Sequence, residues 1–293
     1  MTKPKLSFWQ IWNLSFGFLG VQIGYSLQNS NTSSIFESLG ADVSHLSYFW
    51  LAAPLAGMIV QPIVGLFSDG TWTRWGRRIP YILGGSLISA LALVLMPNCP
   101  KLLAFAPLAM GAFILLFMDL SFNVTMQPFR ALVADMLDDS QKTQGYVVQT
   151  FLINLGAVVG AILPLVMTWL GVSDEAAPGH VSPHIAYSYY AGGAILLLTV
   201  LVTSFKTREY PPGEFARYNN LSEEDAKPMS FVGLMRNVPG VMVRLGVTQF
   251  FSWAALFLMW TYLKPAITGV VTDHATVSYT HLRAHETSQD LVC

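Results

Sequence analysis

Charged residues are scarce in this chain. Asp, Glu, Lys and Arg make up 11% of its 293 residues and hydrophobic residues make up 53%, whereas globular domains carry roughly 25% charged residues. So few charges cannot cover a water-facing surface, and most side chains are therefore expected to face lipid or other helices. The 16 basic and 17 acidic residues give a net charge of −1, which excludes a nucleic-acid binder that works through bulk positive charge.

Cysteines and the common catalytic motifs are also missing. The two cysteines, Cys99 and Cys293, cannot form a disulfide framework or a zinc site. The chain has no Gly-rich phosphate loop and no HExxH or GxSxG pattern, so the common enzyme classes are not indicated. We therefore predict no enzymatic activity, no cofactor and no metal site.

Long apolar runs dominate the sequence. A membrane helix needs about 20 mostly apolar residues, and seven segments qualify: Phe8–Gln28, Leu46–Ser68, Pro80–Met96, Leu102–Gln127, Tyr146–Leu170, Ile185–Ser204 and Val241–Leu263. The first segment is too long and too polar to be a signal peptide. This pattern predicts an all-α integral membrane protein.

Basic residues gather in alternate loops between these segments, beginning with Lys3 and Lys5 ahead of the first one. Because basic residues mark the cytoplasmic side, we predict a cytoplasmic amino terminus. A polar stretch from Lys206 to Asn237 separates the sixth and seventh segments. We predict a six-helix transmembrane bundle at 1–205, a cytoplasmic linker at 206–238 and a seventh helix within 239–276. This is half of a twelve-helix transporter plus one helix.

The polarity of the sequence changes abruptly at Val277. The remaining segment, VSYTHLRAHETSQDLVC, resembles an in-frame translation of a transposase-type short-read sequencing adapter. A natural polar tail is the alternative interpretation. We interpret 277–293 as a non-native tail and exclude it from fold reasoning. On this interpretation the gene is expected to continue beyond the point where the tail begins.

A motif of glycines and charges follows the second segment. Glycines permit a tight turn, and arginines there can pair with carboxylates on nearby helix ends. Ordinary positive-inside charge would explain the arginines alone, but not the spacing of the glycines and the acid. We therefore predict a conformational latch formed by Gly65, Asp69, Arg74, Gly76, Arg77 and Arg78, with Asp135 within reach of its arginines.

The fourth segment carries a polar stripe. Asp119 lies inside an otherwise apolar run, and an unpaired carboxylate in a membrane costs at least about 2.5–3.5 kcal/mol, so such residues are usually functional. At about 100° per residue, Asn123 and Arg130 fall near the same helix face as Asp119. A buried Asp119 neutralised by a neighbouring hydroxyl or amide, and an Arg130 that only ends the helix, are the structural alternatives.

Amides and a phenol on three further segments could bind a polar solute. Their side chains can hydrogen-bond sugar hydroxyls in a central cavity, although interhelical hydrogen bonding explains any single one equally well. The predicted cavity residues are Gln22, Tyr25, Gln28, Gln61, Asn123, Gln149 and Asn154.

Together these motifs resemble a known family. The spacing after the second segment is similar to the signature of the major facilitator superfamily. The runs GVQIGYSLQ from Gly20 and WLAAPLAGMIVQPIVG from Trp50, with the pattern from Asp119 to Asp135, resemble the plant sucrose–proton symporters and their bacterial relatives. The resemblance implies a twelve-helix symporter of the glycoside–pentoside–hexuronide:cation group. It also implies that Asp119 and Arg130 serve proton coupling and sugar transport.

We therefore predict proton-coupled symport of a glucoside such as sucrose or maltose across the cytoplasmic (inner) membrane. The expected partners are the sugar, a coupling cation and the lipid bilayer, with no nucleic acid. A sodium-coupled glycoside symporter is one alternative, although such relatives place paired carboxylates on the second helix and Leu46–Ser68 contains none. A non-transporting sugar sensor is another, and no constellation in the bundle supports a membrane-embedded enzyme.

Overall fold

A computed structural model describes residues 3–40, 52–103, 105–177, 179–219, 233, 238–256 and 258–259 of the chain. Two compact units are present, Met1–Met229 and Ser230–Cys293. In the described part of the chain the regular structure is helical, and β pairing is limited to a single bridge between Thr73 and Gly76. The all-α prediction is confirmed.

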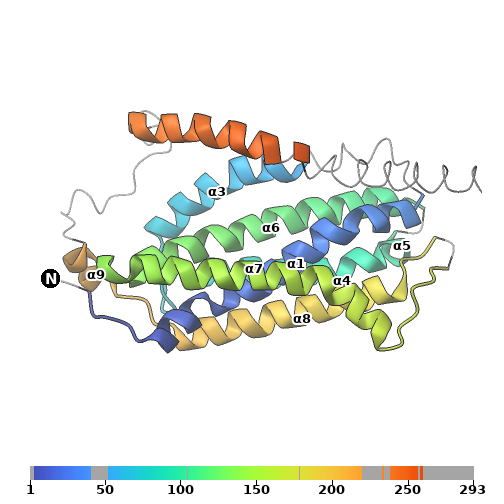
Figure 1. The fold of residues 1–293 in the computed structure, drawn as a ribbon, viewed down its shortest axis with the longest axis horizontal. Helices are drawn as coiled ribbons and strands as arrows, with labels where there is room; N and C mark the ends of the chain where they lie inside the picture. Colours follow the sequence, from blue (N-terminus) through green and yellow to red (C-terminus); the bar gives the residue numbers. More distant parts are fainter. Residues whose placement is uncertain are drawn as a thin grey trace, which may run out of the picture. The chain divides into compact units, whose positions relative to one another are not determined.

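Six helices build the first unit, and Figure 1 shows them running lengthwise beside one another. They are α1 (Phe8–Ser38), α3 (Ala52–Gly70), α4 (Ile79–Leu95), α6 (Pro107–Met136), α7 (Asp139–Trp169) and α8 (Pro183–Lys206). Shorter elements complete the unit: η2 (Met96–Asn98), α5 (Cys99–Leu102) and α9 (Pro212–Tyr218).

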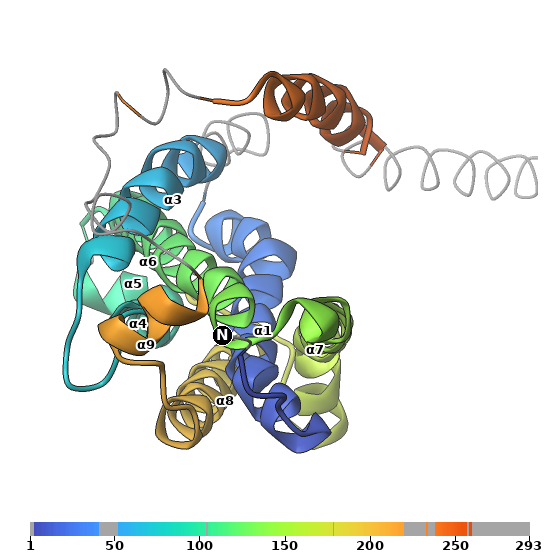
Figure 2. The ribbon, with the colours of Figure 1, turned by 90° about the vertical axis from the view of Figure 1, so that its left-hand side faces the viewer.

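Helix α1 lies at the centre of this bundle. It packs against α6, α7 and α8, as the end-on view of Figure 2 shows, while α6 also packs against α3 and α4. Buried apolar residues such as Phe18, Phe122 and Phe129 fill the space between these helices. Phe18 and Phe129 stack with ring centroids 5.3 Å apart, so the middle of the bundle is a packed apolar core.

Two glycines bring the backbones of α7 and α1 into contact. A Cβ atom added to Gly156 would lie 2.5 Å from the carbonyl oxygen of Leu19, and one added to Gly160 would lie 2.5 Å from that of Ile23. Small residues four positions apart allow this close approach between helices in membranes. The sequence Gly-x-x-x-Gly on α7 therefore sets how α1 is held.

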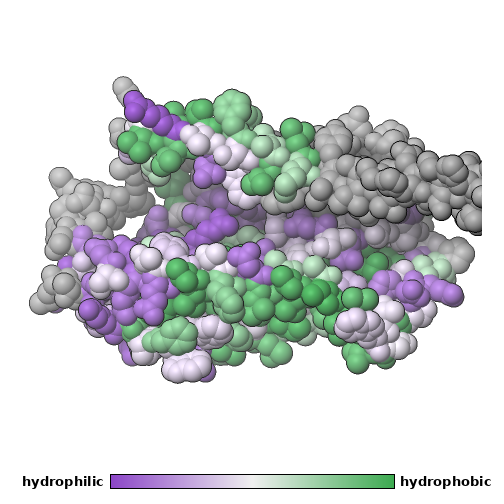
Figure 3. All heavy atoms as spheres, in the orientation of Figure 1, coloured by the Kyte–Doolittle hydropathy of each residue, from purple (hydrophilic) through white to green (hydrophobic). Residues whose placement is uncertain are grey.

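The outward surface of the bundle suits lipid. Exposed residues along α7 include Phe151, Leu155, Val158 and Leu165. Figure 3 shows apolar residues along the middle of the unit and polar residues gathered at the end where α9 lies. Four described helical stretches are long and apolar enough to cross a membrane: Ile79–Leu102, Pro107–Met136, Asp139–Trp169 and Pro183–Lys206.

The helix bounds differ from the predicted segments in understandable ways. Helix α1 continues ten residues beyond the predicted end at Gln28, because no Gly or Pro interrupts the polar stretch that follows. Helix α7 begins earlier than predicted, at Asp139, because the Asp138 side chain accepts a hydrogen bond from the backbone N–H of Ser140 (3.1 Å) and caps the helix.

Helix α9 lies within the predicted linker, where the sequence analysis expected no helix. In the second unit the described chain is helical at 233, 240–256 and 258–259, and 241–256 and 258–259 lie within the predicted seventh segment. The predicted start of the second segment at Leu46 and the predicted non-native tail at 277–293 lie outside the described residues.

Candidate functional site

A chain of polar side chains crosses the bundle from α1 through α6 to α3. Gln28 on α1 donates a hydrogen bond from Nε2 to Oδ1 of Asp119 on α6. One turn further along α6, Asn123 donates from Nδ2 to the carbonyl oxygen of Asp119 (2.8 Å). Gln61 on α3 donates from Nε2 to Oδ1 of Asn123 (2.6 Å). We call Gln28, Asp119, Asn123 and Gln61 the interior polar chain.

The α1 end of the interior polar chain is deeply buried. Gln28 is 0% exposed and Asp119 is 2% exposed. Within the described part of the protein, Oε1 of Gln28 and Oδ2 of Asp119 have no hydrogen-bond partner. Buried polar atoms are normally paired, so two unpaired atoms on two bonded side chains call for a chemical explanation.

The other predicted cavity residues lie apart from this chain. The ring of Tyr25 packs edge-on against Phe122, with centroids 5.7 Å apart. Gln149 is buried and donates to the carbonyl oxygen of Phe129 (3.2 Å). Asn154 is exposed and donates to its own helix at Thr150 (2.8 Å). Of these three contacts, only the Gln149 bond from α7 to α6 is the interhelical hydrogen bond that the sequence analysis left open as an alternative.

Gln22 also lies outside the interior polar chain. It is half-buried, and its Cβ would be 3.0 Å from a Cβ placed on Gly156 of α7. Arg130 is exposed on α6, eleven residues after Asp119, which corresponds to a rise of about 16 Å along the helix. The structure therefore places the predicted coupling pair on one helix and forms no direct bond between the two side chains.

A second polar group lies at the end of the bundle where α9 is found. Arg78 is its centre, because its guanidinium forms ion pairs with Asp69 and with Asp135 (2.9 Å) and donates to the hydroxyl of Ser68. Arg77 also pairs with Asp135, at 2.8 Å. Arg78 is 6% exposed, so these acids compensate its positive charge where water has little access. The predicted reach of Asp135 to Arg77 and Arg78 is present in the structure.

Glu209, which follows α8, closes this group from the other side. Its carboxylate accepts hydrogen bonds from the backbone N–H groups of Arg77 (3.0 Å), Arg78 (2.8 Å) and Ile79 (2.9 Å). Glu209 therefore caps the first turn of α4 from a distant part of the chain, where a negative charge is also favoured by the helix dipole. We call Asp69, Arg77, Arg78, Asp135 and Glu209 the charged cluster.

Gly76 is required for this arrangement on two counts. Its φ of +118° lies in a region that favours glycine. A Cβ at this position would also lie 2.7 Å from Cδ of Glu209. The glycine that the sequence analysis singled out therefore allows the acid to reach the start of α4.

The amino terminus and α9 cover the charged cluster. The guanidinium of Arg77 lies over the ring of Phe215 on α9 (4.0 Å), and Nζ of Lys3 lies 5.9 Å from the same ring. Lys3 also donates to the carbonyl oxygen of Ala134 (3.3 Å). Burial lowers the pKa of the Lys3 ammonium group, and Lys142 acts in the same direction.

Burial also shifts the pKa of Glu209, the acidic member of the charged cluster that lies outside the helices. It raises the pKa of the Glu209 carboxyl, while the three backbone N–H groups and the Arg77 guanidinium act in the opposite direction.

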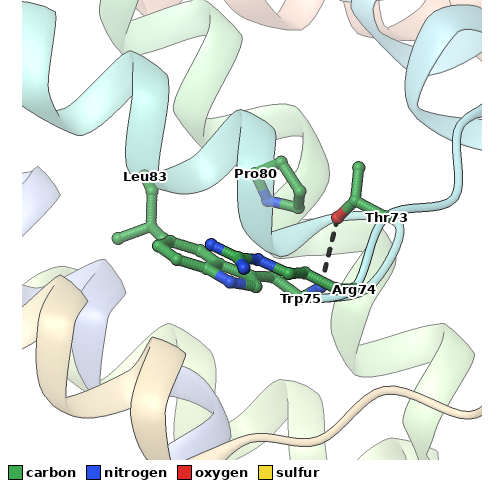
Figure 4. Close-up of a pocket in the computed structure, with 5 residues that line it drawn as sticks. All are labelled: Thr73, Arg74, Trp75, Pro80 and Leu83. Atoms are coloured by element: carbon green, nitrogen blue, oxygen red, sulfur yellow. Dashed lines mark hydrogen bonds between the residues drawn. The ribbon is translucent and has the colours of Figure 1, made fainter.

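Two further residues of the predicted latch lie at its edge. Arg74 is exposed and lies over the ring of Trp75, 5.7 Å from the centroid, beside a surface hollow of about 260 Å³. Figure 4 shows this hollow, which is lined by Thr73, Arg74, Trp75, Pro80 and Leu83. Gly65 faces only the Gln127 amide, at an ordinary distance of 3.9 Å from an added Cβ. Neither residue takes part in the ion pairs among the described residues.

The sequence analysis missed Glu209 and Phe215. Both lie in the segment interpreted as a plain linker, and the contacts described above are with residues at least 130 positions away in the chain. An acid and an aromatic residue soon after the sixth apolar run are the only local signal for them. Among the described residues, no group of three or more His, Cys, Asp or Glu side chains could hold a metal ion.

Known proteins share this sequence pattern. Sucrose transport protein SUT1 of Oryza sativa subsp. japonica is 27% identical over 267 residues, covering 82% of this chain and 49% of the relative. General alpha-glucoside permease of Schizosaccharomyces pombe is 25% identical over 299 residues, covering 95% of this chain and 50% of the relative. Sucrose transport protein SUC3 of Arabidopsis thaliana is 31% identical over 157 residues, covering 48% and 26%. This chain spans about half the length of the relatives that match most of it.

A family model described as MFS/sugar transport protein matches residues 35–276. The matched range includes α3, α4, α6, α7 and α8 and the four membrane-crossing stretches. It also includes the whole charged cluster and, apart from Gln28, the interior polar chain. The protein is therefore a multi-pass membrane protein, and its relatives are transporters. Because the match covers most of its length, the chain belongs to the MFS sugar transport protein family.

Proposed function

We propose that the complete transporter carries a glucoside such as sucrose or maltose across the cytoplasmic (inner) membrane together with a proton. The observation that carries the proposal is Asp119, a buried carboxyl on a membrane-crossing helix that is bonded to an amide of α1. A proton-coupled carrier needs a group whose charge changes during the cycle. Relatives named as sucrose transport proteins and a general alpha-glucoside permease support the choice of solute.

In this proposal the interior polar chain separates two tasks. Asp119 takes up and releases the proton, because it is the one acidic residue in the membrane interior of the first six predicted segments. Gln61 and Asn123 are only half-buried, and their amides can exchange their mutual bond for bonds to sugar hydroxyls. Gln22 and Tyr25 on α1 are half-buried as well and complete the polar wall.

Arg130 remains the proposed partner of Asp119 in another conformation of the cycle. It shares the α6 face and carries a permanent positive charge that could stabilise the carboxylate after proton release. Gln149 and Asn154 stay part of the proposed cavity only if α7 turns relative to α6, because each is bonded elsewhere in this conformation.

The charged cluster is proposed to act as the conformational latch on the cytoplasmic side, which also places the amino terminus in the cytoplasm. It ties the turn between α3 and α4 to the end of α6 through the ion pairs of Arg77 and Arg78 with Asp135, and to the segment after α8 through the hydrogen bonds of Glu209. Elements that are held together in one state and released in another are the usual basis of switching between conformations.

Radiolabelled sugar uptake into proteoliposomes that contain the complete protein tests this function. We expect sucrose or maltose to accumulate when an inward proton gradient is imposed, and to equilibrate without accumulation when the gradient is collapsed. A sodium gradient alone should drive no accumulation. Accumulation that follows sodium and ignores pH would replace the proton with sodium, and absence of any sugar binding or uptake would refute the transport proposal.

A further inference from the structure

The contact between Gln28 and Asp119 joins two helices through two side chains that each have a donor or acceptor to spare. Gln28 uses Nε2 as a donor to Oδ1 of Asp119. Its own Oε1 and the second oxygen of Asp119, Oδ2, are both buried, and among the described residues both are unpaired. Two oxygen acceptors cannot satisfy each other, so the contact is chemically incomplete as long as Asp119 is a carboxylate.

A single proton on Asp119 completes the contact with Gln28. A carboxylic acid has one O–H donor and one carbonyl acceptor, and a primary amide has the matching acceptor and donors. If the proton is on Oδ2, Asp119 can donate to Oε1 of Gln28 while it accepts from Nε2 at Oδ1. The unpaired oxygens then belong to a single reciprocal pair, and no net charge is buried.

The surroundings of Asp119 favour the neutral form of its carboxyl group. Helix α6 packs against α1, α3, α4, α5 and α7. No ion pair or hydrogen bond joins Asp119 to the titratable residues of these helices or of α6 itself: Tyr25, Glu37, Asp69, Tyr81, Cys99, Lys101, Arg130, Asp135, Asp139, Lys142 and Tyr146. On α8, the hydroxyl of Tyr189 is engaged by the carbonyl oxygen of Leu27 (3.1 Å). Among the residues that the structure describes, a charged Asp119 would therefore lack a compensating cation in this conformation.

We propose that Asp119 and Gln28 form a reciprocal acid–amide pair in this conformation, and that Gln28 is the positioning residue through which proton release from Asp119 loosens α1 from α6. When the O–H bond on Oδ2 breaks, the proton passes to water and a carboxylate remains. One of the two hydrogen bonds is lost, and Oδ2 and Oε1 then repel each other. The link to transport rests on the proposed proton-coupled function, but the pair itself does not.

Infrared difference spectroscopy of this chain in detergent micelles tests the pair. The C=O stretching band of a protonated, hydrogen-bonded carboxylic acid should appear as the pH is lowered in the wild type and should be absent in Asp119→Asn. In Gln28→Met the band should move to higher wavenumber, because its carbonyl and its O–H have both lost their partners. Gln149→Leu removes an equally buried amide on another helix and should leave the band unmoved.

Thermal unfolding provides the second readout. The melting temperature of the wild type should fall as the pH is raised through the range in which the band disappears. The fall should be smaller in Asp119→Asn, because asparagine and Gln28 form a reciprocal amide pair at every pH and only other groups such as Glu209 still titrate. If Gln28→Met does not fold, Gln28→Asn keeps the polarity but is one methylene too short, and the same upward shift is expected.

Two results would overturn the proposal: a spectrum without the Asp119 acid band at every pH at which the chain stays folded, or a band that Gln28→Met and Gln28→Asn leave in place. If the band does not respond to Gln28 while Asp119→Asn still abolishes proton-driven uptake in the complete protein, the pair is wrong and the proposed function stands. If the band responds as expected and Asp119→Asn accumulates sugar normally, the pair is correct and the proposed function is wrong.

Discussion

The interior polar chain and the charged cluster solve the same problem in opposite ways. Both bury ionisable side chains between helices, but the charged cluster satisfies its central group completely, with Arg78 bonded to two carboxylates and a hydroxyl. The interior polar chain leaves one oxygen of Asp119 and one of Gln28 unpaired among the described residues. The first arrangement suits a structural joint, and the second suits a group that changes its protonation state.

The difference also separates stability from function. Removing one partner from a satisfied buried ion pair leaves an uncompensated charge, and the whole bundle is destabilised. Replacing Asp119 with asparagine keeps the bond from Gln28, so it costs less stability and instead removes the ability to release a proton. We therefore expect mutations of the buried members of the charged cluster to act mainly on folding, mutations of the exposed Asp69 to act mainly on switching, and mutations at Asp119 to act mainly on coupling.

The largest effect on stability is expected for Arg78→Ala. This change removes a 6% exposed guanidinium and breaks a network of two ion pairs and a hydrogen bond to the buried Ser68 hydroxyl, so the free energy of unfolding should fall by about 3 kcal/mol. Arg74→Ala is the matched control, because this exposed arginine only lies over Trp75, and it should change stability by less than about 0.5 kcal/mol. Denaturation in detergent measures both. Equal effects of the two variants would show that the ion pairs of Arg78 do not contribute to the free energy of unfolding.

A smaller effect is expected for Glu209→Ala, which removes the acceptor of three backbone N–H groups at the start of α4, two of them buried. Loss of such an acceptor should cost about 2 kcal/mol. The exposed Glu214 on α9 provides the control, since Glu214→Ala leaves no N–H group unpaired. A helix α4 that melts identically in both variants would contradict the capping role.

Glu209→Gln tests how the stability contributed by this site depends on pH. Because burial raises the pKa of Glu209 above its ordinary value, the stability contributed by its carboxyl is greatest in acid and is lost as the pH rises through the raised pKa. Glutamine does not ionise. The melting temperature of Glu209→Gln relative to the wild type should therefore rise between about pH 5 and about pH 8, and a relative decrease would mean that the N–H groups outweigh burial.

The smallest effect on stability is expected for Asp69→Asn, because the Asp69 side chain is 56% exposed and exposed ion pairs contribute at most about 1 kcal/mol. In the complete transporter this change should slow the interconversion of inward-facing and outward-facing states and leave sugar affinity largely intact. Transport rates and equilibrium sugar binding measure the two quantities. A normal rate combined with strongly weakened binding would contradict its placement in the latch.

The sequence was sufficient for much of this picture. Apolar runs predicted the helices, and helical spacing on α6 predicted that Asn123 lies beside Asp119, because both signals depend on residues close together in the chain. The pairing of Asp119 with Gln28 on α1 could not be predicted, since it depends on the rotation of two helices about their axes. Arg130 shares the face of Asp119 as predicted, yet its exposure follows from packing that periodicity does not contain.

In the charged cluster, too, contacts between distant parts of the chain could not be predicted from the sequence. Its motif was recognisable, because the glycines and arginines follow one another within a short turn. Glu209 was not, because its role arises only when the end of α8 returns to the start of α4.

Transport by Asp119→Asn in the complete protein tests the central claim most directly. Asparagine keeps the shape of Asp119 and its bond to Gln28 but cannot release a proton. We predict that the variant still binds sugar with near wild-type affinity and no longer accumulates it when a proton gradient is imposed. Accumulation at the wild-type rate would contradict the account and place the coupling group elsewhere in the transporter.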